Sequence, residues 1–437
     1  MLFLLAIPAP AHATVIQEVT SRGGIKAWLV EDHKLPLVSM RFAFKGGIEQ
    51  DPADKQGLAH LTTELLTQGA GPYDAQTFQQ ALADRSISLG FGAGRDEISG
   101  SLKALSADKD KAFEMLALAL TKPRFAPREI EQLRAQQLSS IRAQFSSPDW
   151  QARFVLLKHI FEGHPYAMRR LGSLESVSGL RRDDVVRFAS DHFAREGLVV
   201  AVAGDMTPQE LSVALDKVFG ALPRNARNAA IREVAWPQDT PVILVQRSGT
   251  QTNLMFAMPG PKRDDPDWHA AEIANYILGG GGFSSRLMKD VRSDKGLTYG
   301  IHTGLAAMEH GGMIMGDAAT DNARTGEAWG VIRATLRRFY EDGVSAKEIA
   351  AAKDYLTGSM PLALTSTDKI SGVLVDIQRE NLGIDYLDRR NDLIRSVTQE
   401  DVERVIRKWF DPDKITLSLA GKPEGIMPTR TEQMVRE

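Results

Sequence analysis

The residues best suited to chemistry lie in one stretch that begins with four glycines at 279–282 and runs to Gly300. Within it, Arg292 and Tyr299 stand seven positions apart. A guanidinium and a phenol both donate hydrogen bonds without giving up a proton, so as a pair they suit an oxygen that gains negative charge during a reaction. Spacing alone favours a structural alternative, because arginine is common near the end of a helix and tyrosine is common in strands.

The elements around this pair are predicted to bring it together. Apolar residues on one face indicate a short helix over 285–292, and Gly296 is suited to end it. Alternating apolar residues then indicate a strand over 299–306. A tight return from helix to strand would place Arg292 near Tyr299.

The glycines before this helix could serve in other ways. Glycine-rich backbone at a helix start can hold an anion, but no Lys-Ser or Lys-Thr pair follows Gly282, so the order of a nucleotide-binding P-loop is missing. Ser284 or Ser285 could act as a nucleophile in an independent hydrolase. That reading fails because the stretch has no histidine and aspartate placed to activate a hydroxyl.

Composition sets broad limits on the class of protein. The chain has 437 residues, of which 43% are hydrophobic and 25% charged, which is typical of a globular protein with two or more domains. A net charge of -3 gives no indication of nucleic-acid binding, and the absence of cysteine excludes disulfides and thiolate catalysis. No apolar run has transmembrane length, so we expect no stable membrane insertion.

The amino terminus resembles a secretion signal. Residues 1–13 form an apolar stretch that ends in Ala-His-Ala, which suits cleavage after Ala13, although a basic segment before the apolar residues is missing. We read 1–13 as a signal peptide remnant. The mature chain would then begin near Thr14 and work in the periplasm, and the alternative is a cytoplasmic protein.

The order of predicted elements repeats between the halves of the chain. Strands are predicted over 25–31, 37–44, 87–91, 97–105 and 198–203, and again over 242–246, 253–258, 299–306, 313–317 and 417–420. Helices are predicted over 54–67, 74–84 and much of 108–192, and again over 268–278, 285–292 and much of 322–410. Gly90, Gly92 and Gly94 lie between strands and indicate a turn or bulge.

One ungapped alignment supports a duplication. Residues 184–204 match 401–421 at a constant offset of 217 (401 minus 184), with Asp, Val, Arg, Phe, Ala and Gly coinciding. This predicts an α+β fold of two homologous domains at 14–222 and 238–437, joined by a linker at 223–237. The alternative is two unrelated halves with similar helix and strand endings.

Four motifs together resemble the pitrilysin-type (M16) zinc metallopeptidase family. They are the G-G-G-x-S-S-R-L run with its later Arg and L-x-Y, the helix Gly57-Leu58-Ala59-His60, the turn Gly163-His164-Pro165-Tyr166, and Ala203-Gly204-Asp205. The resemblance implies two α/β-sandwich domains, each with a mostly antiparallel sheet against helices, forming half of a clamshell. It further implies that Arg292 and Tyr299 hold the substrate carbonyl, and that Gly280, Gly281, Gly282, Ser284 and Ser285 line the substrate chamber.

The helix that would hold zinc departs from this family. In the family's inverted zinc motif, histidines at i and i+4 bind the metal and a glutamate at i+3 activates the water. Here His60 remains, but Thr63 stands at the base position, Glu64 at the second ligand position and Ser140 at the expected third. His60 and Glu64 could still share a metal, but without a third ligand and a base both affinity and turnover should collapse. We therefore expect no metal in this chain.

The two findings combine into one functional expectation. Some family members divide the work between two chains, one with the zinc motif and one with the Arg/Tyr pair, and this chain resembles the second. It is expected to be the non-zinc subunit of a heterodimeric metalloendopeptidase, inactive alone, whose homologous partner bears H-x-x-E-H and holds the zinc. The substrate would be a peptide or an unfolded protein. The alternative is a scaffold without a role in proteolysis, like the core subunits of respiratory complexes that resemble these peptidases.

Overall fold

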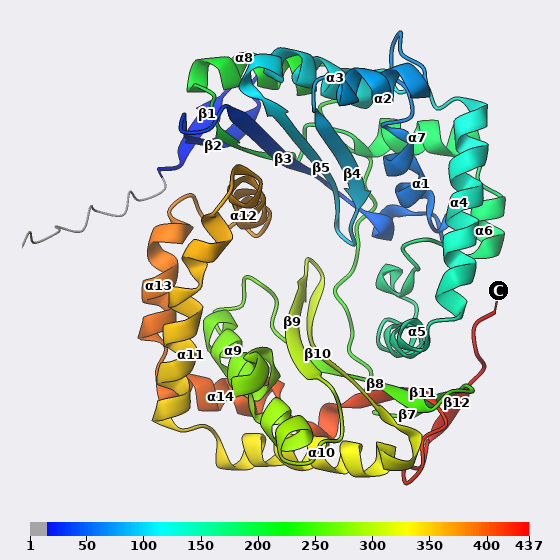
Figure 1. Ribbon diagram of the computed structural model, residues 1–437, viewed down its shortest axis with the longest axis vertical. Coiled ribbons are helices and arrows are strands. Elements are labelled where there is room, and N and C mark those ends of the chain that lie inside the picture. Colours follow the sequence, from blue (N-terminus) through cyan, green and yellow to red (C-terminus); the bar gives the residue numbers. More distant parts are fainter. Residues whose placement is uncertain (1–14, 437) are drawn as a thin grey trace, which may run out of the picture.

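The computed structural model describes residues 15–436 and contains two six-stranded sheets, one in each half of the chain (Figure 1). The predicted leader at 1–13 lies outside the described residues. The first sheet contains β1 (Gln17–Thr20), β2 (Lys26–Glu31), β3 (Leu37–Lys45), β4 (Ser88–Ala93), β5 (Glu97–Leu105) and β6 (Val199–Gly204). The second contains β7 (Val242–Gln246), β8 (Gln251–Pro259), β9 (Ile301–Met308), β10 (Gly311–Asp321), β11 (Thr416–Gly421) and β12 (Arg430–Glu432).

The two sheets share one topology. The strand orders are β1-β2-β6-β3-β5-β4 and β12-β7-β11-β8-β10-β9, so the last five strands correspond one to one. In both sheets the pairs are antiparallel except β2 with β6, β7 with β11 and β7 with β12. β6 and β11 begin at Val199 and Thr416, which are 217 positions apart (416 minus 199), as in the ungapped alignment. The predicted duplication and fold class are confirmed.

Helices cover both faces of the sheets. In the first half they are α1 (Leu58–Leu65), α2 (Ala75–Ala83), α3 (Lys109–Thr121), α4 (Pro127–Phe145), α5 (Pro148–Ile160), α6 (Leu174–Ser178), α7 (Arg182–His192) and α8 (Pro208–Phe219). In the second half they are α9 (Trp268–Asn275), α10 (Thr325–Asp342), α11 (Ala346–Gly358), α12 (Thr367–Arg379), α13 (Tyr386–Ser396) and α14 (Gln399–Trp409). Pro127 and Pro148 open α4 and α5, where the lost N–H costs nothing.

One helix from each half packs against the sheet of the other half. α5 follows the first sheet in sequence but packs on the second, where Val155 and Leu156 share a core with Val245 and Met255. α12 makes the reciprocal move, and its Leu374 joins a core on β2, β3 and β6 (Figure 1). Residues 223–241 contain no helix or strand, so a linker separates the halves in sequence while the exchanged helices join them in packing.

Three local expectations need correction. The predicted strand at 299–306 begins at Ile301, because the backbone at Thr298 to Gly300 turns before joining β10. Gly90 and Gly92 lie inside the edge strand β4, not in a turn. β1 and β12 were not predicted, since both are short and have little apolar alternation. No helix in residues 15–436 is long and apolar enough to cross a membrane.

Candidate functional site

The glycine-rich stretch forms two widened helical turns around a tight one. α9 continues into a π-helix, η5 (Tyr276–Gly280), a 3₁₀ turn η6 follows (Gly282–Ser284), and a second π-helix η7 spans Met288–Ser293. Hydrogen bonds from Gly281 N to Tyr276 O and from Asp294 N to Lys289 O, both 2.9 Å, close the wide turns. Sequence periodicity predicts a helix here but not its widening. Single π turns recur at functional sites.

The glycines are required by close packing and by backbone angle. A Cβ at Gly279 would lie 2.4 Å from the Thr303 hydroxyl oxygen, so the segment can sit against β9 only without a side chain there. Gly282 has φ +57°, which favours glycine. Gly280 is exposed and Gly281 and Gly282 are half-buried, so their backbone is accessible.

The two serines hold the turn. Ser285 is fully buried and its hydroxyl donates to the Gly282 carbonyl at 2.7 Å. Ser284 is exposed, but its hydroxyl donates to the Gly281 carbonyl, also at 2.7 Å. Ser285 has no exposed surface in this arrangement, so its expected contact with substrate stays a prediction. Neither hydroxyl bonds to a histidine or a carboxylate in the described chain, so a serine nucleophile gains no support.

Arg292 lies in the second widened turn, and in the described chain its guanidinium N–H donors have no hydrogen-bond partner. Its guanidinium carbon sits 4.6 Å from the centroid of the Phe283 ring. Within residues 15–436 no ion pair or side-chain hydrogen bond engages it. Arg286, six residues earlier, differs: it binds Glu348 through two bonds of 2.7 and 2.9 Å, and this pairing lowers the pKa of Glu348 to about 2. Arg286 thus has a structural role.

Tyr299 is presented to solvent by the bend before β9. Leu297 is buried, and the Thr298 hydroxyl lies within hydrogen-bond distance of the carbonyls of Gly300 and Ala319, at 2.7 and 2.8 Å. With both neighbours anchored, the Tyr299 side chain is 85% exposed. Among the described residues, no hydrogen bond or cation–π contact joins the side chains of Arg292 and Tyr299, so their convergence on one carbonyl remains a prediction.

The helix that would carry zinc is firmly placed. Asp51 accepts hydrogen bonds from Gly57 N and Ala59 N at 2.7 and 2.8 Å, which anchors the start of α1. Gln137 of α4 donates to the Gly57 carbonyl at 3.0 Å and so ties the two helices together. The motif positions that lack the family's zinc-site residues therefore lie on a helix whose first turn is firmly anchored.

The side chains at these positions do not fit zinc. Burial, with the nearby positive charge of Arg170, lowers the pKa of His60 to about 4. A charge that opposes a protonated imidazole also opposes a divalent cation. Thr63 is buried with its hydroxyl donating to the His60 carbonyl at 2.9 Å, and Glu64 and Ser140 are exposed on α1 and α4. Residues 15–436 contain no group of three or more potential ligands in metal-binding arrangement.

A metal measurement tests this directly. The purified chain is expected to hold well under one equivalent of zinc after dialysis, because a base and two ligands are replaced and Arg170 adds repulsion. Elemental analysis of wild type and of His60→Ala provides the measurement and its control. Tightly bound, stoichiometric zinc that disappears in His60→Ala would contradict the expectation.

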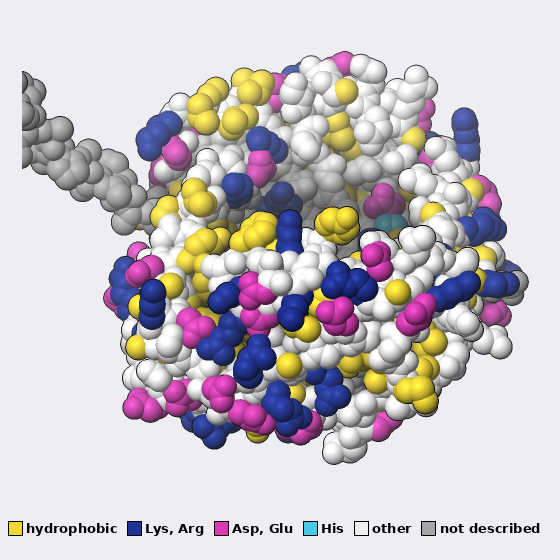
Figure 2. Space-filling view, turned by 60° about the horizontal axis from the view of Figure 1, so that its bottom comes forward, with side chains coloured by type: hydrophobic (Ala, Val, Ile, Leu, Met, Phe, Trp, Pro, Cys, Tyr) yellow, Lys and Arg dark blue, Asp and Glu magenta, His cyan; other side chains and the backbone are white. Residues whose placement is uncertain are grey.

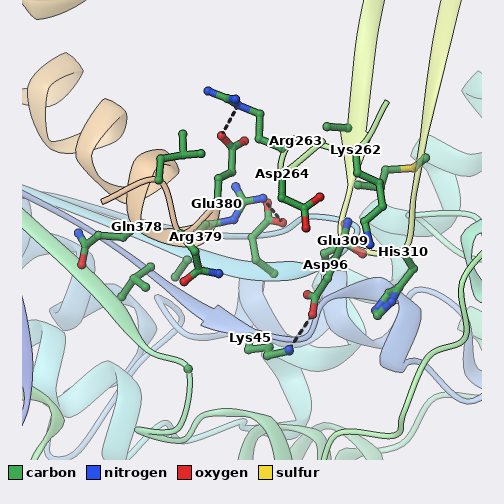
Figure 3. Close-up of a pocket in the computed structure, with 18 of the residues that line it drawn as sticks. Lys45, Asp96, Lys262, Arg263, Asp264, Glu309, His310, Gln378, Arg379 and Glu380 are labelled. Atoms are coloured by element: carbon green, nitrogen blue, oxygen red, sulfur yellow. Dashed lines mark hydrogen bonds and ion pairs between the residues drawn. The ribbon is translucent and has the colours of Figure 1, made fainter. Parts of the chain in front are cut away.

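Sequence reasoning missed a cavity between the halves. It has a volume of about 870 Å³ and lies where the β9–β10 hairpin meets β3, β5 and the end of α12 (Figure 3). Ion pairs Lys45–Glu309 at 2.6 Å and Arg379–Glu97 at 3.3 Å cross it. Its residues come from seven segments that are separated in the sequence, so no local pattern could indicate it.

The fold and site together define a class of protein: a duplicated α+β clamshell half with a vacated metal helix and an uncommitted arginine and tyrosine in its second domain. Two family models match the chain, "Insulinase (Peptidase family M16)" over residues 26–172 and "Peptidase M16 inactive domain" over 179–356. The chain belongs to the M16 peptidase family.

Relatives agree with this assignment. The "Non-peptidase homolog YmxG" of Helicobacter pylori is 26% identical over 354 residues, which covers 80% of this chain and 81% of the relative. A Pseudomonas fluorescens structure described as a peptidase M16 inactive domain is 29% identical, with a TM-score of 0.88 over 94% of this chain and 100% of that one. The periplasmic protease PqqL of Escherichia coli shares the fold, with 12% identity and a TM-score of 0.80. The match covers 97% of this chain and 48% of PqqL.

Proposed function

We propose that this chain is the non-zinc subunit of a heterodimeric M16 metallopeptidase. Arg292 and Tyr299 would donate hydrogen bonds to the scissile carbonyl of a peptide or unfolded protein. A homologous partner with H-x-x-E-H would hold the zinc, and this chain would hold none. Donors aimed at the oxygen that becomes an oxyanion stabilise the transition state more than the ground state.

One observation carries the proposal. Arg292 and Tyr299 are left uncommitted in the same chain whose metal helix is vacated, while Arg286 nearby is fully paired. Core packing does not require a half-buried arginine without a carboxylate partner or a tyrosine that is 85% exposed. They suit a ligand that arrives from another body.

Two comparisons support a division of labour. A Schizosaccharomyces pombe relative, 23% identical over 401 residues, is named a probable mitochondrial-processing peptidase subunit beta, so that protein works as a subunit. PqqL is about twice as long as the matched region, since this chain covers 48% of it. A second chain of similar length would supply the other half.

The remaining parts of the proposal concern the substrate contacts and the cellular location of the protein. Gly280, Gly281 and Gly282, with Ser284 on the exposed side of the turn, would lie against the substrate backbone. We place the protein in the periplasm on the strength of the apolar leader and of the fold shared with a periplasmic protease.

A scaffold without proteolytic work is the second candidate. It is favoured by the name of the Helicobacter pylori relative, a non-peptidase homolog. It needs the fold and an interface, but gives no use to an uncommitted Arg292 and Tyr299. The two candidates differ in whether activity depends on this chain.

Titration with the partner separates them. Alone, the chain should cleave neither peptides nor unfolded proteins. Activity on a quenched peptide should appear when an H-x-x-E-H homologue from the same genome is added, and it should saturate near equal molarity. Chelator-sensitive cleavage by this chain alone would contradict the proposal, and a complex no more active than the partner alone would favour the scaffold.

A further inference from the structure

Phe283 is an exposed aromatic residue that core packing does not explain. Its side chain is 69% exposed and belongs to none of the apolar cores of the described chain. Leaving so much apolar surface in water is unfavourable. The backbone turn that carries the ring is nevertheless held, because the Ser284 and Ser285 hydroxyls donate to the carbonyls of Gly281 and Gly282.

The ring lies against the guanidinium of Arg292. The distance of 4.6 Å from the guanidinium carbon to the ring centroid is within the range of a cation–π contact. In residues 15–436, two other arginines that lie over aromatic rings are also held by carboxylates, whereas Arg95 and Arg169 are not. Arg286 stacks on Phe339 and binds Glu348, and Arg263 stacks on Trp268 and binds Glu380 at 2.8 Å. Arg292 has the ring and no carboxylate.

The absence of a carboxylate beside Arg292 in the described residues has a chemical consequence. A carboxylate would occupy the fork of N–H donors that a substrate oxygen needs. An aromatic face contacts the flat face of the guanidinium and leaves the donors at its edge available. Phe283 can thus fix the direction of Arg292 without using its hydrogen-bonding capacity.

We propose that Phe283 is a positioning residue that orients Arg292 toward the scissile carbonyl of the peptide substrate. This inference rests on the proposed function of Arg292. Gly282, with φ +57°, and the widened turn η7 set the backbone on the two sides of the contact. The hydroxyl bonds of Ser284 and Ser285 stiffen the turn that carries the ring.

The contact itself is measurable in the chain without a partner. Protons on the Arg292 side chain, lying over the ring face, should show an upfield ring-current shift in an NMR spectrum of arginine-labelled protein. The shift should vanish in Phe283→Leu and persist in Phe283→Tyr. An Arg292 signal at the same position in wild type and Phe283→Leu would overturn the inference and leave the proposed function standing.

Kinetics of the assembled peptidase test the role. Phe283→Leu should lower kcat by about 3- to 10-fold with KM changed less than about twofold, because a loosened donor fits the transition state less often. Phe283→Tyr keeps the ring and should restore kcat. Leu362→Ala is a matched control, since Leu362 is 67% exposed in the same half, and it should leave kcat unchanged.

A double-mutant cycle shows whether Phe283 acts through Arg292. In an Arg292→Lys background, Phe283→Leu should cost little more, whereas an independent role would give additive losses. Additive losses, or an unchanged kcat in Phe283→Leu, would overturn the inference while Arg292→Lys still supports the proposed function. If Arg292→Lys itself leaves kcat unchanged, the proposed function fails and this inference with it.

Discussion

Tyr299→Phe is expected to lower kcat of the assembled peptidase by about 10²-fold, because removal of one donor to a developing oxyanion has an effect of this size. The change keeps the ring and deletes only the phenol hydroxyl, which has no hydrogen-bond partner in the described residues. Packing and assembly should therefore be unaffected. Steady-state kinetics on one quenched peptide, with the complex verified by size-exclusion chromatography, give the measurement.

Tyr340→Phe is the matched control. Tyr340 lies on α10 in the same half, is partly buried, and packs against the domain core. Its hydroxyl can be removed at a site with no proposed part in chemistry, so kcat should stay within about twofold of wild type. An assembled Tyr299→Phe complex with unchanged kcat and KM would remove the catalytic role of Tyr299 and favour the scaffold.

The bend that exposes Tyr299 shows where sequence reasoning stops. Alternation from Leu297 onward predicts a strand, and a strand does follow from Ile301. The Thr298 hydroxyl, however, lies within hydrogen-bond distance of the carbonyls of Gly300 and Ala319 and stabilises a bend. The strand therefore begins two residues later than predicted, at Ile301 and not at 299. Periodicity reads the side chains along one segment and cannot see a bond to a partner 21 residues away.

The larger features of the fold also divide into those that sequence patterns predict and those that depend on contacts between distant residues. The duplication was predictable because matching helices and strands recur at one offset and each half buries its own core. The exchange of α5 and α12 was not, since an amphipathic helix has the same pattern whichever sheet it covers. The degenerate metal helix was readable from residue types at fixed spacing, but the charge of Arg170 on His60 comes from a loop more than a hundred residues later.

Arg292→Lys is expected to lower kcat nearly as much as Tyr299→Phe, by roughly 10- to 100-fold. A lysine keeps the positive charge but offers a point donor on a flexible stem, and it stacks less well on the Phe283 ring. The planar fork is what could bind a carbonyl oxygen while its face rests on the ring. KM should change less than kcat if the contact strengthens in the transition state.

Two other arginines test whether the loss is specific to this position. Arg333→Lys changes an exposed residue of α10 for which no ion pair is present in the described chain, and it should leave both kinetics and stability unchanged. Arg286→Lys breaks a two-bond pairing with Glu348, so it should reduce the unfolding free energy by about 0.5–1 kcal/mol while kcat of the assembled enzyme stays near wild type. Equal kinetic losses in Arg286→Lys and Arg292→Lys would instead mean that the whole helical segment has shifted, and the fork of Arg292 would then have no special part in catalysis.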